Sequence, residues 1–142
     1  YPAKRGQNWQ LLLPVYYKFK RYYLDEPLYA YVVYPNSMSS GDMTEEKEMN
    51  RWGEHEEIIR QTLCRIPLTE NEIEKYDNEI TIRYAKKRFF TAIDYRDKKM
   101  IKEQYMILKD CQENTDEIRA LYLRNYYLIL KLFYKIKEIF KR

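Results

Sequence analysis

The stretch "LCRIPLTENEIEKY", residues 63–76, decides how the chain folds. Pro67 disfavours helical backbone at the residue before it, so a helix that arrives from the N-terminal side ends here. Thr69 and Glu72 have the S/T-x-x-E spacing of a capping box, which satisfies two backbone N–H groups at the start of a helix. Apolar residues then recur at helical spacing, at Ile73, Tyr76, Ile80 and Tyr84. The stretch predicts a helix, a short corner and another helix.

We expect the first of these two helices to run from Asp42 to about Ile66. Asp42 and Glu45 have the spacing of a capping pair, and the acidic residues that follow suit the positive end of the helix dipole. The apolar residues at helical spacing in this range are Met49, Trp52, Ile59, Leu63 and Ile66.

Two further helices are predicted toward the C-terminus. One covers Lys98 to Asp110, and the other runs from Thr115 to about Phe140, with Asn114 and Glu117 as its capping pair. The only segment that resembles a strand is "YAYVV" at residues 29–33. The predicted fold class is all-α, with about four helices after an N-terminal segment and a long last helix.

The N-terminal segment, residues 1–43, differs from the rest because it is rich in tyrosine, proline and turn-forming residues. We interpret it as an extended partner-binding arm, followed by a helical domain over residues 44–142. One short amphipathic helix is expected within "LPVYYKFKRYYL", residues 13–24, where Pro14 suits the first helical turn.

The composition favours a protein that binds other proteins. The chain has 142 residues and a net charge of +4, a weaker basic excess than dedicated nucleic-acid binders carry. Its 16 tyrosines against three glycines suit interfaces, because a tyrosine ring can be buried at one end and hydrated at the other. A genome rich in A and T is an alternative cause of the tyrosine content.

Cys64 and Cys111 are lone cysteines that we predict to be small core residues.

No pattern of catalytic or cofactor-binding residues is present in the sequence. The glycines at 6, 41 and 53 are too far apart to form a phosphate-binding loop. His55 is the only histidine, so no helical pair of histidines can hold a metal, and we interpret "GEHEE", residues 53–57, as a solvated acidic face. A serine or cysteine nucleophile would have no base other than His55. We therefore predict a non-enzymatic protein without metal or cofactor.

The segment from Arg83 to Lys102 combines basic and aromatic residues more densely than any other. Its candidate contact residues are Arg83, Lys86, Lys87 and Arg88. These side chains can follow a phosphate backbone while neighbouring rings stack on bases. In the alternative, the aromatic residues are helix packing and the lysines are solvated, and the positive patch faces acidic lipid or an acidic protein subunit.

The C-terminal helix is predicted to be covered by another protein. Its candidate interface residues are Tyr122, Tyr126, Ile129 and Phe133. Arg124 and Lys131 interrupt the apolar run at roughly 2–3 kcal/mol each, so the segment is not expected to cross a membrane. Apolar residues on several faces of one helix are more than a small domain can cover by itself.

The corner "EEIIRQTLCRIP", residues 56–67, resembles subunit 7 of the mitochondrial cytochrome bc1 complex. The matching residues are Glu56, Glu57, Arg65, Ile66 and Pro67, and "IRYAKKRF" at residues 82–89 is similar to the basic helix that follows in that family. The resemblance implies a structural subunit of complex III in the respiratory electron-transport chain. Such a subunit lies on the matrix side of the mitochondrial inner membrane, holds no heme or quinone, and stabilises the assembly of cytochrome b and the core subunits.

Two alternatives remain at this point. "RIPLTENEIEKYDNEIT", residues 65–81, also resembles subunit 5 of the alpha subcomplex of complex I, which keeps an accessory role but changes the complex. The other alternative is an accessory protein of a mitochondrial ribosome that contacts RNA through the segment from Arg83 to Lys102.

Salt dependence separates RNA contact from protein contact. If the basic segment binds RNA, the variant Lys86→Ala/Lys87→Ala/Arg88→Ala should be released, and association should weaken steeply with salt as counterions leave the phosphates. We expect instead that the protein stays in a detergent-solubilised respiratory complex at high salt and is lost in Ile129→Asp/Phe133→Asp. Sedimentation with ribosomal particles that nuclease abolishes would contradict this expectation.

Overall fold

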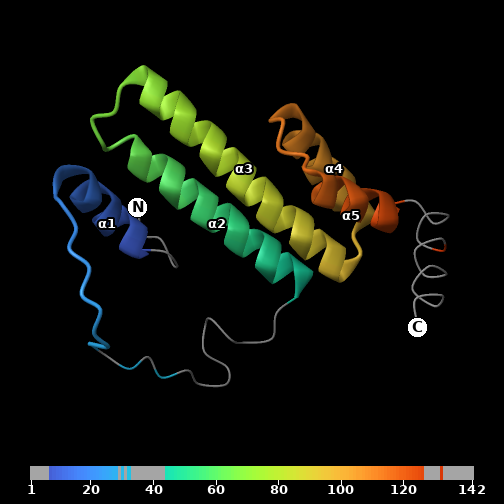
Figure 1. The fold of residues 1–142 in the computed structure, drawn as a ribbon, viewed down its shortest axis with the longest axis horizontal. Helices are drawn as coiled ribbons and strands as arrows, with labels where there is room; N and C mark the ends of the chain where they lie inside the picture. The colour runs from blue at the N-terminus through green and yellow to red at the C-terminus, as the bar shows by residue number, and fades with distance from the viewer. Residues whose placement is uncertain (1–6, 29, 31, 33–43, 127–131, 133–142) are drawn as a thin grey trace. The chain divides into compact units, whose positions relative to one another are not determined.

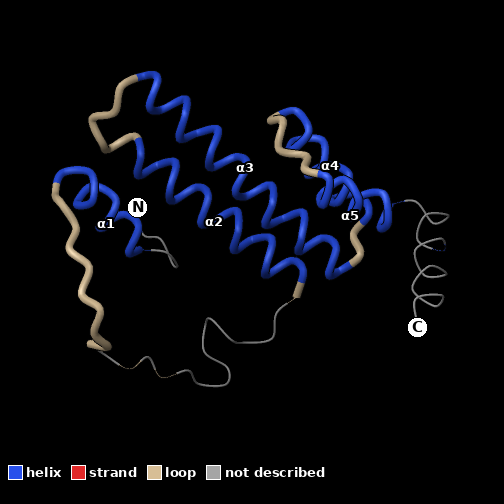
Figure 2. Tube along the Cα trace, viewed as in Figure 1, coloured by secondary structure: helices blue, strands red, loops and turns tan. Residues whose placement is uncertain are grey.

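The computed structural model describes residues 7–28, 30, 32, 44–126 and 132. They form the helices α1 (Gln7–Lys18), α2 (Glu45–Leu63), α3 (Glu70–Tyr95), α4 (Lys98–Asp110) and α5 (Asp116–Tyr126) (Figure 1). Over these ranges only helix and loop occur, without a strand, so the all-α prediction is confirmed (Figure 2). The chain divides into two compact units, Tyr1–Thr69 and Glu70–Arg142.

In the first unit, α2 begins at Glu45 because Thr44 caps it. Thr44 has extended backbone, and its hydroxyl accepts a hydrogen bond from the Lys47 backbone N–H at 3.3 Å. The predicted cap, Asp42, was therefore wrong by two residues. Both residue types are good N-caps, and the choice between them depends on where helical backbone begins. Three glutamates in the first turn complement the helix dipole, as expected.

The end of α2 lies at Leu63, three residues before the predicted end. The backbone N–H groups of Arg65 and Ile66 bond the carbonyls of Thr62 and Leu63, both at 3.0 Å. These bonds span three residues rather than four, so they tighten the chain into a turn that leaves the helix. Ile66 remains buried after the turn. The corner prediction is confirmed, since Pro67 follows this turn and α3 begins directly after Thr69.

The helix α1 contacts α2 and differs from the prediction in its position. It begins at Gln7, so Pro14 lies inside the helix rather than in its first turn, and Tyr22 and Tyr23 lie beyond its end. An internal proline removes a backbone hydrogen bond and normally destabilises a helix. Leu12 and Leu13, just before Pro14, are half-buried, so packing on α2 offsets this cost.

In the second unit, Arg96 and Asp97 alone connect α3 to α4. Arg96 adopts left-handed backbone with φ 63°, and the Asp97 backbone N–H bonds the Ala92 carbonyl at 2.9 Å, which ends α3 in a Schellman motif. The Asp97 carboxylate accepts bonds from the backbone N–H groups of Lys99 at 2.9 Å and Met100 at 3.1 Å. One residue thus ends α3 and caps α4, and the predicted range of α4 is confirmed.

The connection from α4 to α5 repeats this geometry. Gln112 has φ 58°, and the Glu113 backbone N–H bonds the Leu108 carbonyl at 2.7 Å. Thr115 then caps α5, because its hydroxyl accepts a bond from the Ile118 backbone N–H at 3.4 Å. The predicted cap, Asn114, was wrong by one residue.

The core of the second unit is formed by α3, α4 and α5. Its buried apolar residues are Ile80, Tyr84, Ala85, Phe89, Ala92, Ile101, Tyr105, Leu108, Ile118 and Tyr122. Full burial of the larger of these side chains contributes roughly 1.5–3 kcal/mol each.

Neither cysteine belongs to the buried core. Cys64 is exposed, which contradicts its predicted core position, and Cys111 is half-buried.

The described last helix is short. With 11 residues, α5 is shorter than α3, which has 26 residues and is the longest described helix. The expectation of a long last helix is thus not met within the described residues, and its predicted extension to Phe140 lies outside them apart from Leu132, which is helical. None of the helices described here is long and apolar enough to cross a membrane.

The position of Asp97 predicts a measurable loss of stability on substitution. Asp97→Ala removes the cap of α4 and should lower the free energy of unfolding by about 1 kcal/mol, whereas Asp97→Asn retains an accepting oxygen and should change it little. Chemical denaturation measures the difference. The matched control is Asp94→Ala, because Asp94 is exposed in the last turn of α3. Equal stability of the two Asp97 variants would show that the cap does not hold the corner.

Candidate interaction surfaces

Three tyrosines connect α4 to α5 in a continuous stack. The rings of Tyr105 and Tyr122 are parallel within 1° at a centroid distance of 3.9 Å, and Tyr122 stacks on Tyr126 at 5.2 Å. Tyr122, a predicted interface residue, is buried in this stack and packs inside its own chain. Tyr126, also predicted at the interface, is only half-buried at the end of the stack. Ile129 and Phe133 lie outside the described residues.

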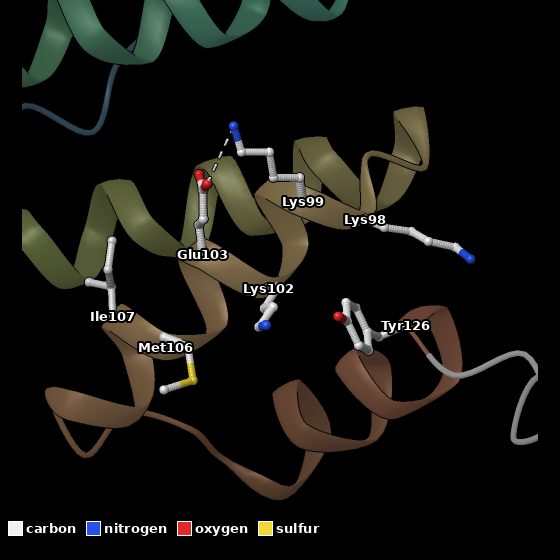
Figure 3. Close-up of a pocket in the computed structure, with 7 residues that line it drawn as sticks. All are labelled: Lys98, Lys99, Lys102, Glu103, Met106, Ile107 and Tyr126. Carbon is white, nitrogen blue, oxygen red and sulfur yellow. Dashed lines mark ion pairs between the residues drawn. The ribbon is translucent and has the colours of Figure 1, made fainter.

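A groove of about 900 Å³ lies beside Tyr126, between α4 and α5. Its lining residues are Lys98, Lys99, Lys102, Glu103, Met106, Ile107 and Tyr126 (Figure 3). Lys102 and Tyr126 enter the space from opposite sides, with the Lys102 ammonium 6.0 Å from the centre of the tyrosine ring. Glu103 forms an ion pair of 3.9 Å with Lys99. The groove thus combines a cationic side with an apolar one.

The α3 part of the predicted basic segment is not a continuous charged surface. Lys86 forms a 2.7 Å ion pair with Glu113 in the α4–α5 connection. Lys87 and Arg88 are half-buried beside Phe89, which is fully buried, and Arg83 is exposed. The structure therefore divides the segment from Arg83 to Lys102 at the Arg96–Asp97 corner and places Lys102 of α4 beside Tyr126 instead.

The sequence contained only a weak indication of this groove. Lys98 and Lys102 are four residues apart and share one face of α4. Their proximity to Tyr126 depends on the antiparallel return of α5, which spacing within α4 does not show.

The acidic surroundings of His55 are partly buried rather than fully solvated. The His55 ring packs edge-on against Trp52 at a centroid distance of 6.2 Å. Glu56 is half-buried and bonds Arg60 at 2.7 Å, whereas Glu54 and Glu57 are exposed. Among the residues that the structure describes, no group of three or more histidine, cysteine or acidic side chains is arranged to hold a metal.

A further surface comprises the last turn of α1 and the chain that follows it, residues 15–28, which we call the N-terminal arm from here on. Every residue from Val15 to Leu28 is exposed, with Tyr22 at 91% and Tyr23 at 87% exposure. The root of this arm is attached to the first unit, because the Tyr17 hydroxyl donates a hydrogen bond of 3.0 Å to the Pro67 carbonyl. The arm is therefore an apolar surface connected to a defined anchor.

Comparison with known protein families, with curated proteins and with solved structures finds no match for this chain. The resemblance to subunit 7 of cytochrome bc1 accordingly stays a prediction.

The Lys86–Glu113 pair has a testable effect on stability. Both side chains are more than a third exposed, so solvent screens the pair and a double-mutant cycle of Lys86→Ala and Glu113→Ala should give a coupling of about 0.2–1 kcal/mol that falls with added salt. The same cycle on Lys99 and Glu103, which are 3.9 Å apart and more exposed, should give less. Zero coupling at Lys86 would return this lysine to the set of residues available for a partner.

Proposed function

We propose that this protein is a non-catalytic structural subunit of a larger assembly, bound through its N-terminal arm. The observation that carries the proposal is the run of exposed apolar side chains in the first unit. Its large members are Tyr16, Tyr17, Phe19, Tyr22, Tyr23, Leu24, Leu28 and Val32. Soluble monomers rarely expose so many contiguous large apolar groups, whereas binding surfaces do so.

The arm is suited to a specific partner surface. Burial of each such side chain in a partner contributes roughly 1.5–3 kcal/mol, offset in part by the ordering of the arm. Each buried tyrosine also needs a hydrogen-bond partner for its hydroxyl. Lys18, Lys20 and Arg21 add positive charge near the root of the arm. A partner groove with apolar pockets, hydrogen-bond acceptors and acidic groups at one end meets these requirements.

The start of the arm is already ordered before binding. The Arg21 guanidinium lies 5.3 Å above the centre of the Tyr16 ring, a distance within the range of a cation–π contact. Together with the bond from Tyr17 to Pro67, this contact positions the first residues of the arm against their own unit. Less conformational entropy is then lost on binding than for a free peptide.

For the identity of the assembly, we propose complex III of the mitochondrial respiratory chain. The support is the sequence resemblance at residues 56–67 to the matrix-side subunit 7 of cytochrome bc1. In this proposal the protein lies on the matrix side of the inner membrane and contacts cytochrome b and the core subunits. A ribosomal role is less favoured, because Lys86 is paired with Glu113 and Tyr84 and Phe89 are buried, which leaves only Phe90 and Tyr95 of this segment's rings exposed for base stacking.

Substitution in the arm tests the structural role. Tyr22→Ser/Tyr23→Ser should remove the protein from the assembly, measured by native electrophoresis and mass spectrometry of co-purifying subunits after mild detergent solubilisation. Its thermal stability should change little, because both rings are exposed in the free chain. The matched control is Ile73→Ser/Tyr76→Ser, which changes exposed apolar residues of α3.

Two outcomes would contradict the proposal at different levels. A wild-type protein that migrates as a monomer, or equal retention of the arm variant and the control, would exclude the arm as the anchor. Retention with subunits of complex I or with ribosomal proteins would keep the structural role and exclude complex III.

A further inference from the structure

We propose that the groove between α4 and α5 binds the headgroup region of an anionic phospholipid, so that this face of the second unit lies against an acidic membrane surface. The inference concerns a different surface from the N-terminal arm and does not depend on which assembly the arm binds. Three observations support lipid binding: the positive charge of the groove, the position of its lysines at the start of α4, and the mixed polarity of its lining.

The charge of the groove is positive. Among the described residues that line the groove, the three lysines Lys98, Lys99 and Lys102 outnumber the one carboxylate, that of Glu103. The 3.9 Å pair of Glu103 with Lys99 is exposed and weak, and it projects from α4 away from Tyr126 (Figure 3). The sequence after Tyr126 has too few acidic residues to neutralise these lysines. Residues 127–142 contain one acidic residue, Glu138, and five basic residues, Lys131, Lys135, Lys137, Lys141 and Arg142. The chain's own C-terminal sequence is therefore a poor complement to the groove, and an anionic surface is a good one.

The lysines of the groove are unfavourably placed for the stability of α4. Lys98 and Lys99 occupy the first turn, where the positive end of the helix dipole repels cations, and this turn has no acidic residue. The carboxylate of Asp97 already accepts the backbone N–H groups of Lys99 and Met100. Helix formation thus does not account for these lysines, whereas attraction of an anion does.

The remaining lining favours lipid over nucleic acid. Met106 is exposed and provides an apolar side chain one turn beyond Lys102, where an acyl chain would lie below a phosphate. Tyr126 has a ring that can bridge apolar and hydrated regions. A base would need an accessible face of this ring, but Tyr122 stacks at 5.2 Å and the Lys102 ammonium lies 6.0 Å from its centre.

Vesicle flotation of the full chain tests the proposal, because aggregated protein does not float. The wild-type chain should float with vesicles of phosphatidylcholine mixed with phosphatidylglycerol and not with phosphatidylcholine alone. Lys98→Gln/Lys99→Gln/Lys102→Gln should reduce the floated fraction at low salt about tenfold or more, since each lysine near an anionic surface contributes appreciably. The same variant should unfold at a nearly unchanged temperature, because the removed repulsion from the helix dipole offsets the loss of the exposed Lys99–Glu103 pair and of the Lys102–Tyr126 contact.

The matched control is Lys75→Gln/Lys109→Gln/Arg119→Gln, which removes the same charge at exposed positions outside both the groove lining and the N-terminal arm. This control should float as the wild type does. If the triple groove variant does not fold, Lys98→Gln alone should still lower the floated fraction several-fold. Equal loss in the control, equal flotation with neutral vesicles, or groove-dependent binding to single-stranded RNA with vesicle binding unaffected would each overturn the proposal.

Discussion

The second unit depends on the corner formed by Arg96 and Asp97. Asp97 acts on both sides of the reversal, since its backbone N–H bonds a carbonyl of α3 and its carboxylate bonds two N–H groups of α4. The reversal also requires left-handed backbone at Arg96, which costs a non-glycine residue about 1 kcal/mol. Packing of α4 on α3, which the reversal allows, buries Phe89, Ala92 and Ile101 and offsets this cost.

The two units differ in how much of their apolar surface they bury. In the second unit the inward faces of three helices meet, and the tyrosine stack from Tyr105 to Tyr126 joins the last two of them. In the first unit α1 contacts α2, but the arm beyond it leaves large apolar side chains in solvent. A chain with this distribution gains free energy when another surface covers the arm. The proposed structural role follows from this difference rather than from any reactive group.

The predictions that succeeded concern local backbone chemistry. The corner at Pro67, the start of α3 after Thr69 and the full range of α4 follow from proline, capping residues and helical spacing, which act over a few residues. The errors arose where local signals were ambiguous or outweighed. Thr44 and Asp42 are both good caps, Thr115 competes with Asn114, and the helix-disfavouring effect of Pro14 is outweighed by contact between α1 and α2. Spacing within α4 likewise could not show that its lysines meet Tyr126.

The sequence by itself determined that the chain is helical, where α3 begins, where α4 begins and ends, and that tyrosine-rich apolar surface exceeds what a small core needs. These properties depend on neighbours along the chain. Only the tertiary structure decided that Lys86 pairs with Glu113, that Tyr122 is buried in a stack, and that the lysines of α4 line a groove with Tyr126. Each of these contacts joins residues more than twenty positions apart, or on different helices, so it exists only once the corners have set the directions of the helices that carry them.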